Sequence, residues 1–257
     1  MSYAKGFILL LLVALPLMVP GKAAAYNEDS RIHFEAFFQV LERDVEEEAT
    51  QFLGENFPEE IASAESLRLL GKLSIQVIDP VEIYGLIGGS DLEIDEFGFS
   101  SDFETAYGGG ARVILFRERD PRRPYHIFVD YHFLKYEVDD EINFNPQIVD
   151  AGGNVIDLAN ENVREEIDWL EQVLKIGVMG RHFEFEPYGG IQFSVVSGED
   201  RINATAQRVD LDLDNDDTFG IFLGTLYYLS PSERAALFIE GSMFDQYSLT
   251  GGIRVGF

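Results

Sequence analysis

The sequence predicts an all-β protein that folds as a single up-and-down antiparallel β-barrel of about ten strands. Three observations support this fold class. Apolar and polar residues alternate with a period of two over much of the chain, which is typical of strands with one apolar face. Short turns and long connections follow one another along the sequence. Aromatic residues and glycines are frequent, a composition suited to strands with tight bends.

The first 25 residues have the features of a secretory signal peptide. Lys5 is followed by the apolar run GFILLLLVALPLMV, and small residues precede a cleavage point after Ala25. The run is shorter than the ~20 residues that a membrane-spanning helix needs, and no other segment supplies such a length. We therefore expect residues 1–25 to be removed and residues 26–257 to form the barrel.

The alternation is clearest in the last strand, from Tyr247 to Phe257. Leu249, Ile253 and Val255 share one face, whereas Arg254 belongs to the other. The same template predicts strands near 31–43, 66–77, 81–92, 103–116, 125–137, 168–181, 185–196, 218–229, 235–244 and 247–257.

The connections between these strands alternate in length. The short turns are IDP, RERDPRRP, HFE and SPSE, and all intervening connections except the last, DQ, are longer. An even number of strands, with short turns at one end and long loops at the other, is the arrangement of transmembrane barrels. Strands of ~9–11 residues also suit a tilted bilayer crossing. Within the first long connection, residues 44–64 are expected to form either a short amphipathic helix or an elaborated outer loop.

The closing strand SLTGGIRVGF ends on an aromatic residue, Phe257. With the signal peptide and the stretches IYGLIGGSDLE, TAYGGGARVIL and EPYGGIQFSV, it makes the chain resemble Gram-negative outer-membrane β-barrels, and in particular the small OmpA/OmpX-like group. The resemblance implies an integral outer-membrane location, contact with outer-membrane lipid and lipopolysaccharide, and recognition of Phe257 by the barrel-assembly machinery. It implies no catalytic residue. A soluble exported barrel, such as a lipocalin-like calyx, is the alternative.

The polar face of the strands, interpreted as the lumen, carries charges of both signs. Glu35 is expected to lie between Arg254 on the closing strand and either Arg68 or Lys72 on the second strand, and Glu240 is expected to reach Arg254. Because an unpaired buried charge costs several kcal/mol, paired charges that fill the lumen are the favoured interpretation. A narrow passive channel for small solutes is the alternative. The inward register contains Glu35, Arg68, Lys72, Glu82, Glu104, Arg112, Asp130, Glu171, Lys175, Glu240 and Arg254.

One strand brings His126, Asp130 and His132 to a single face. At ~3.3 Å per residue, His126 is too far from the other two to share a metal ion with them. Ten-stranded barrels include the omptin proteases, whose acidic and histidine residues line an outer cleft, but no matching motif occurs here. We therefore expect no enzyme, with an outer-membrane hydrolase as the alternative.

The stretch VDLDLDNDDT concentrates carboxylates at Asp210, Asp212, Asp214 and Asp216. An EF-hand is excluded because Asn215 stands where the loop needs glycine and Ile221 where it needs glutamate. A loose Ca²⁺ or Mg²⁺ site on an outer loop is one interpretation, and a solvated acidic loop is the other. No further cofactor is expected.

The chain carries a formal net charge of −27, which argues against nucleic acid as a partner. The acidic residues gather in the long connections, for example in RDVEEEA, EVDDE and ENVREEID. Such a rim would repel anions and collect divalent cations beside lipopolysaccharide phosphates. The expected role is structural or interactive at the cell surface, with a monomer as the expected state.

Overall fold

A computed structural model describes residues 31–47, 50–52, 55–57, 60–94, 99–118, 125–144, 147–149, 155–157, 161–203, 208–215, 218–229 and 234–257. The expected signal peptide lies outside these residues. Within the described part of the chain, no helix is long and apolar enough to cross a membrane.

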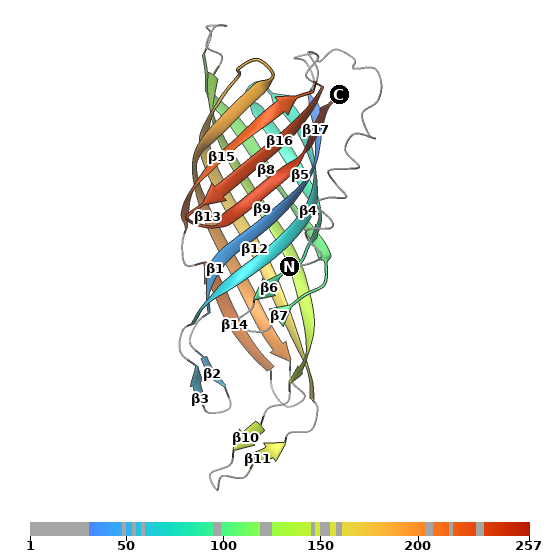
Figure 1. Ribbon diagram of the computed structural model, residues 1–257, viewed down its shortest axis with the longest axis vertical. Helices are drawn as coiled ribbons and strands as arrows, with labels where there is room; N and C mark the ends of the chain where they lie inside the picture. Colours follow the sequence, from blue (N-terminus) through green and yellow to red (C-terminus); the bar gives the residue numbers. More distant parts are fainter. Residues whose placement is uncertain are drawn as a thin grey trace.

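Ten antiparallel strands form a closed ring, because β17 pairs back with β1 (Figure 1). All ten strands predicted from the alternation are present. In the order of the ring they are β1 (Ile32–Glu47), β4 (Glu60–Ile78), β5 (Val81–Ser90), β8 (Glu104–Arg117), β9 (Tyr125–Phe144), β12 (Glu161–Gly180), β13 (Phe185–Asn203), β15 (Phe219–Tyr228), β16 (Ala235–Met243) and β17 (Tyr247–Gly256).

The long connections contain strand as well, in the part of the chain that the structure describes. Small hairpins form there from β2 (Thr50–Phe52) with β3 (Glu55–Phe57), β6 (Glu93–Ile94) with β7 (Phe99–Ser100), and β10 (Gln147–Val149) with β11 (Val155–Asp157). We call this the hairpin end and the opposite one the short-turn end (Figure 1). β1 and β4 stay paired as far as Glu47 and Glu60, so the helix considered for 44–64 is wrong. The alternating pattern simply continues past the predicted strand ends.

The acidic stretch is also a strand, β14 (Arg208–Asn215), and not a loop. It lies between β13 and β1, with Ser197 opposite Asp214 and Val45 opposite Asn215. Because β15, β16 and β17 are short, β14 takes their place beside β13 and β1 at the hairpin end. The wall therefore stays closed there with a different set of strands.

The polarity of the two strand faces reverses along single strands. Near the hairpin end of β12, Glu166 and Asp168 face outward, whereas Ile167 and Trp169 are fully buried inside. Toward the short-turn end, outward Leu174 is 36% exposed, and inward positions carry charges. The outward face of β1 changes in the same way between Val40 and Glu42. The outward face of β9 does so between Phe133 and Lys135. Toward the short-turn end, the barrel therefore has an apolar outer belt around a polar lumen. Toward the hairpin end, it has a polar outer surface around an apolar core.

Two apolar clusters occupy the interior. The larger fills the hairpin end with Trp169, Tyr136, Phe99, Ile167 and their neighbours. The smaller lies toward the short-turn end and contains Phe128, Met179, Phe222, Leu226 and Ala236.

Candidate functional site

Glu35 lies between cations from both neighbouring strands. Its Oε2 is 3.6 Å from Lys72 Nζ on β4, and its Oε1 is 3.7 Å from Arg254 Nε on β17. Strand register explains this, because Glu35 is directly opposite both residues. Arg254 also approaches Glu82 on β5, at 3.9 Å. Of the two neighbours considered from the sequence, Lys72 therefore takes this place and Arg68 does not.

Asp130 on β9 is surrounded by several hydrogen-bond donors. Arg112 Nε lies 2.7 Å from its Oδ2, and the Tyr84 hydroxyl donates to its Oδ1 at 2.5 Å. His132 Nδ1 is 3.7 Å from the same Oδ1. His126 lies four residues before Asp130, toward the short-turn end. The carboxylate is thus occupied by a guanidinium and a hydroxyl, as in a structural ion pair.

Glu240 pairs with Lys175 Nζ at 2.5 Å, in place of the partner expected from the sequence, Arg254. An ammonium or guanidinium over a ring face gains further electrostatic attraction. Three lumen cations lie over rings at 4.2 to 5.1 Å from the centroid, namely Lys72 over Tyr84, Arg112 over Phe128 and Lys175 over Phe222.

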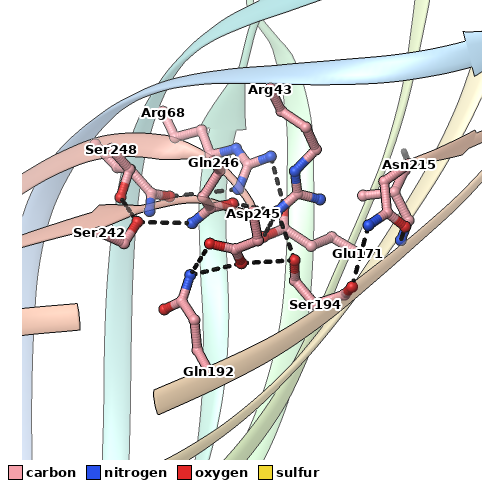
Figure 2. Close-up of polar contacts among 12 residues, drawn as sticks. Arg43, Arg68, Glu171, Gln192, Ser194, Asn215, Ser242, Asp245, Gln246 and Ser248 are labelled. Carbon is pink, nitrogen blue, oxygen red and sulfur yellow. Dashed lines mark hydrogen bonds and ion pairs between the residues drawn. The ribbon is translucent and has the colours of Figure 1, made fainter. Parts of the chain in front are cut away.

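A central layer of polar side chains crosses the lumen between these pairs and the hairpin end, and Figure 2 shows the contacts within this layer. Glu171 on β12 receives Arg68 Nη2 at 2.7 Å and Arg43 Nη2 at 3.5 Å. All three side chains are almost completely buried. Arg43 was not recognised in the sequence, because it lies at the end of the first predicted strand.

The tip of the β16–β17 hairpin turns into the lumen and completes this layer. Phe244 has a φ of 89°, and the next residue, Asp245, points inward (Figure 2). Its carboxylate accepts hydrogen bonds from Gln192 Nε2 at 2.7 and 2.9 Å and from Ser194 Oγ at 2.8 Å. Gln246 accepts from Arg43. The sequence showed these residues only as a short turn, DQ, and gave no sign that the turn enters the barrel.

The apolar cluster of the hairpin end covers the central layer. Tyr136 and Trp169 stack with ring centroids 6.0 Å apart, and Arg68 Cζ lies over the Tyr136 ring, 5.6 Å from its centroid. A partly open cavity of about 140 Å³ lies in the lumen, lined by the charged pairs and by Phe222, Met179 and other apolar side chains. At ~30 Å³ per water molecule, such a volume suits a few internal waters.

Two of the expected metal ligands, Asp212 and Asp214, lie on the outside of β14. Asp212 and Asp214 are exposed, Asp210 is on the same strand, and Asp216 lies outside the described residues. Among the described side chains, no group of three His, Asp or Glu is arranged to hold a metal ion. The Ca²⁺ site therefore stays a prediction.

Two further expected positions lie away from the central layer. Glu104 is exposed at the start of β8 and does not join the lumen pairs described above. Phe257 is 70% exposed, and its amide donates to the Ile32 carbonyl at 3.0 Å at the end of the β1–β17 seam. Its role as an assembly signal stays a prediction.

No protein-family model matches the chain, and no curated protein matches it significantly. Solved structures do match. The outer-membrane protease OmpT from Escherichia coli aligns with 92% of this chain and 99% of its own at a TM-score of 0.53 and 12% identity. The translocator domain of the autotransporter NalP from Neisseria meningitidis aligns with 99% and 95% at a TM-score of 0.40 and 9% identity. The toluene transporter TodX from Pseudomonas putida aligns with 91% and 94% at a TM-score of 0.33 and 9% identity.

Of these three, OmpT has a TM-score above 0.5, so its match shows a shared architecture. At 12% identity, the match to the protease concerns the fold and not the activity. None of the structural matches given above belongs to the OmpA/OmpX-like group that the sequence resembles. The closed ring of antiparallel strands and the match to OmpT together show that the chain has the fold of the Gram-negative outer-membrane β-barrels.

Proposed function

We propose that the chain spans the bacterial outer membrane as a sealed, non-conducting barrel and presents its hairpin end as a rigid structural or interaction surface outside the cell. The observation that carries this proposal is the reversal of polarity along β1, β9 and β12. A soluble barrel has no reason to expose a belt of large apolar side chains, because such a belt costs free energy in water.

The belt has aromatic residues at both margins, as membrane barrels do. Toward the short-turn end, Phe116 packs against Tyr125 and Phe185 against Tyr227. Exposed aromatic residues at the other margin are Phe219, Phe244 and Tyr247. In membrane barrels the short turns face the periplasm, so the hairpin end faces outward in this proposal.

The sealed lumen favours a structural role over a channel. A solute would have to pass the buried Arg43–Glu171–Arg68 layer and then the apolar cluster around Trp169. No enzymatic activity is part of this proposal. The proposal includes contact with outer-membrane lipid and lipopolysaccharide, assembly by the barrel-assembly machinery, and a monomeric state.

Site-specific labelling tests the topology directly, because the chain contains no cysteine. Asp212→Cys at the hairpin end and His182→Cys at the short-turn end are matched exposed positions. We expect a membrane-impermeant maleimide to label the first in intact cells and the second only after lysis. Labelling of both positions only after lysis would contradict the proposed location.

Planar-bilayer recording tests the sealed lumen. The purified chain should give no steady single-channel steps under conditions in which an open porin does. Reproducible steps would favour the channel interpretation and would leave the labelling result unaffected.

A further inference from the structure

The partly open cavity of about 140 Å³ lies on the short-turn side of the central layer. Arg68 and Glu171 of that layer line its inner end, and their side chains are at most 3% exposed. Nearer the short-turn end, the lining side chains keep more contact with solvent, for example 12% exposure for Glu35 and 25% for Arg112. The cavity is therefore closed toward the hairpin end and reached by solvent from the short-turn end.

The ion pairs of the lining fall into two groups by distance. The close pairs, at 2.5 to 2.7 Å, are Lys175–Glu240, Arg112–Asp130 and Arg68–Glu171. Lys72 and Arg254 instead share Glu35, at 3.6 and 3.7 Å. Arg254 also lies 3.9 Å from Glu82. Because these separations are longer than a hydrogen bond, the N–H groups of Lys72 and Arg254 are able to bind a further acceptor.

The lining itself carries more positive than negative charge. Its cations are Arg68, Lys72, Arg112, Lys175 and Arg254, and its anions are Glu35, Asp130, Glu171 and Glu240. Behind this lining, Arg43 approaches Glu171 and Glu82 approaches Arg254, which adds one charge of each sign. Asp245 does not line the cavity, and its carboxylate accepts hydrogen bonds from Gln192 and Ser194. A ligand with a single negative charge therefore fits the groups that it would touch.

A buried donor at the inner end of the cavity also lacks an acceptor. Arg68 is 2% exposed, and its Nε has no hydrogen-bond partner among the described residues. Its other nitrogens are engaged, because Nη2 pairs with Glu171 and Nη1 donates to Gln39 at 3.3 Å. An unsatisfied buried donor costs free energy, so this one favours a ligand with acceptor atoms.

Aromatic rings line the cavity beside the cations. They come from five different strands and are Phe37, Phe128, Tyr188, Phe222 and Phe238. Phe128 and Phe222 lie with their ring centroids 6.2 Å apart. Water gains little at such apolar faces, whereas another ring packs well against them. A cavity of ~150 Å³ is large enough for benzene, so the lining fits a flat apolar body of one ring.

We propose that this cavity binds a small aromatic carboxylate that enters from the short-turn end. Lys72 and Arg254 bind its carboxylate, and the rings of Phe128 and Phe222 pack against its body. The pocket is blind, because the Arg43–Glu171–Arg68 layer closes its inner end. The inference goes beyond the proposed surface role of the hairpin end and does not depend on it.

The test is isothermal titration calorimetry on the full chain folded in detergent micelles, with benzoate as the probe and empty micelles as the blank. We expect saturable binding of benzoate at one site per chain. Benzylammonium has a similar size and the opposite charge, and it should not bind. Lys72→Gln should weaken benzoate binding roughly tenfold or more, the loss expected for one charge-assisted hydrogen bond.

Two further variants separate binding from structure. Lys72→Arg keeps the charge and should retain most of the affinity, whereas a merely structural effect of substitution at this position would affect both variants. Lys135 is 42% exposed on the outside of β9, and Lys135→Gln should bind benzoate like the wild type. If Lys72→Gln fails to fold, Arg254→Gln provides the second test with the same expected loss of affinity.

Three results would overturn the inference. The first is a wild type whose benzoate heats do not saturate or do not exceed the blank. The second is equally tight binding of benzylammonium and benzoate. The third is a folded Lys72→Gln or Arg254→Gln protein that binds benzoate like the wild type. None of these results would affect the maleimide labelling of the two ends, so failure of the inference is distinguishable from failure of the proposed function.

Discussion

Arg68 Nη2 lies 2.7 Å from Glu171 Oε2 at the centre of the lumen, and neither side chain is more than 3% exposed. Arg43 approaches the same carboxylate from β1 at 3.5 Å. One glutamate therefore holds two buried guanidinium groups from different strands. This arrangement ties β12 to β1 and β4 across the barrel, in addition to the hydrogen bonds around its wall.

The first prediction concerns removal of this carboxylate. Glu171→Gln should destabilise the folded barrel by about 3–5 kcal/mol, because two buried arginines lose their counter-charge. The measurement is the urea or heat midpoint of the gel-mobility change between folded and unfolded chain. Glu137→Gln, at an exposed position on β9, is the control and should leave the midpoint nearly unchanged. Equal midpoints for both variants would contradict the structural role of the central layer.

The second prediction tests the belt. Leu174→Arg places a charge on the outward face within the belt, whereas Glu166→Arg places the same residue eight positions away on the same face of β12. An arginine on the lipid face costs ~2–4 kcal/mol near the bilayer midplane and much less at the margins. We therefore expect folding into lipid vesicles to be impaired only by Leu174→Arg. Equal folding yields for the two variants would argue against a membrane-embedded belt.

The sequence was sufficient to predict the ring, because strict alternation identifies strands and register follows from their order. That register also places Glu35 between Lys72 and Arg254. The reversal of polarity was readable in principle, since Glu166 and Asp168 alternate with Ile167 and Trp169 in the opposite sense to the rest of β12. The reversal was missed because the polar face of every strand was assumed to point inward along its whole length.

Other features depend on contacts between distant segments. The placement of β14 beside β1 joins residues about 170 positions apart, and no local pattern specifies that neighbour. The inward turn at Asp245 likewise depends on Gln192 and Ser194, which belong to a strand that does not pair with β16 or β17. Sequence alternation describes which face a residue occupies, but it does not say which turn enters the lumen.

The third prediction concerns the apolar cover of the lumen. Trp169→Ala removes the largest fully buried side chain of the cluster and should cost ~3–5 kcal/mol through lost packing and the cavity left behind. The charged central layer still crosses the lumen in this variant, on the short-turn side of the space that the tryptophan leaves. We therefore expect the variant to stay non-conducting in planar bilayers. Steady channel activity in Trp169→Ala would show that the apolar cluster alone seals the barrel. Trp169→Phe is the conservative control, with a smaller loss of stability.

The fourth prediction uses two glycines of the barrel wall that differ in their surroundings. A Cβ atom at Gly220 on β15 would lie 1.9 Å from Asp245 Oδ1, whereas a Cβ atom at Gly85 on β5 would meet nothing within 4 Å. Gly220→Ala should therefore displace the Asp245 carboxylate from Gln192 and Ser194 and lower the heat midpoint of the folded form. Gly85→Ala should be neutral or slightly stabilising, because alanine reduces the freedom of the unfolded chain.

Variants of Asp245 combined with Gly220→Ala distinguish two contributions of the inward turn, namely its hydrogen bonds and its tight contact with β15. If Asp245 matters only through its hydrogen bonds, Asp245→Asn should destabilise the barrel, because an amide NH2 group cannot accept the bonds that a carboxylate oxygen accepts from Gln192 and Ser194. Adding Gly220→Ala to that variant should then cost little more, because those hydrogen bonds are already lost. If the tight contact itself matters, Asp245→Ala should rescue Gly220→Ala, because the shortened side chain leaves room for the new methyl group. Equal heat midpoints for Gly220→Ala and Gly85→Ala would contradict the close approach of the turn to β15.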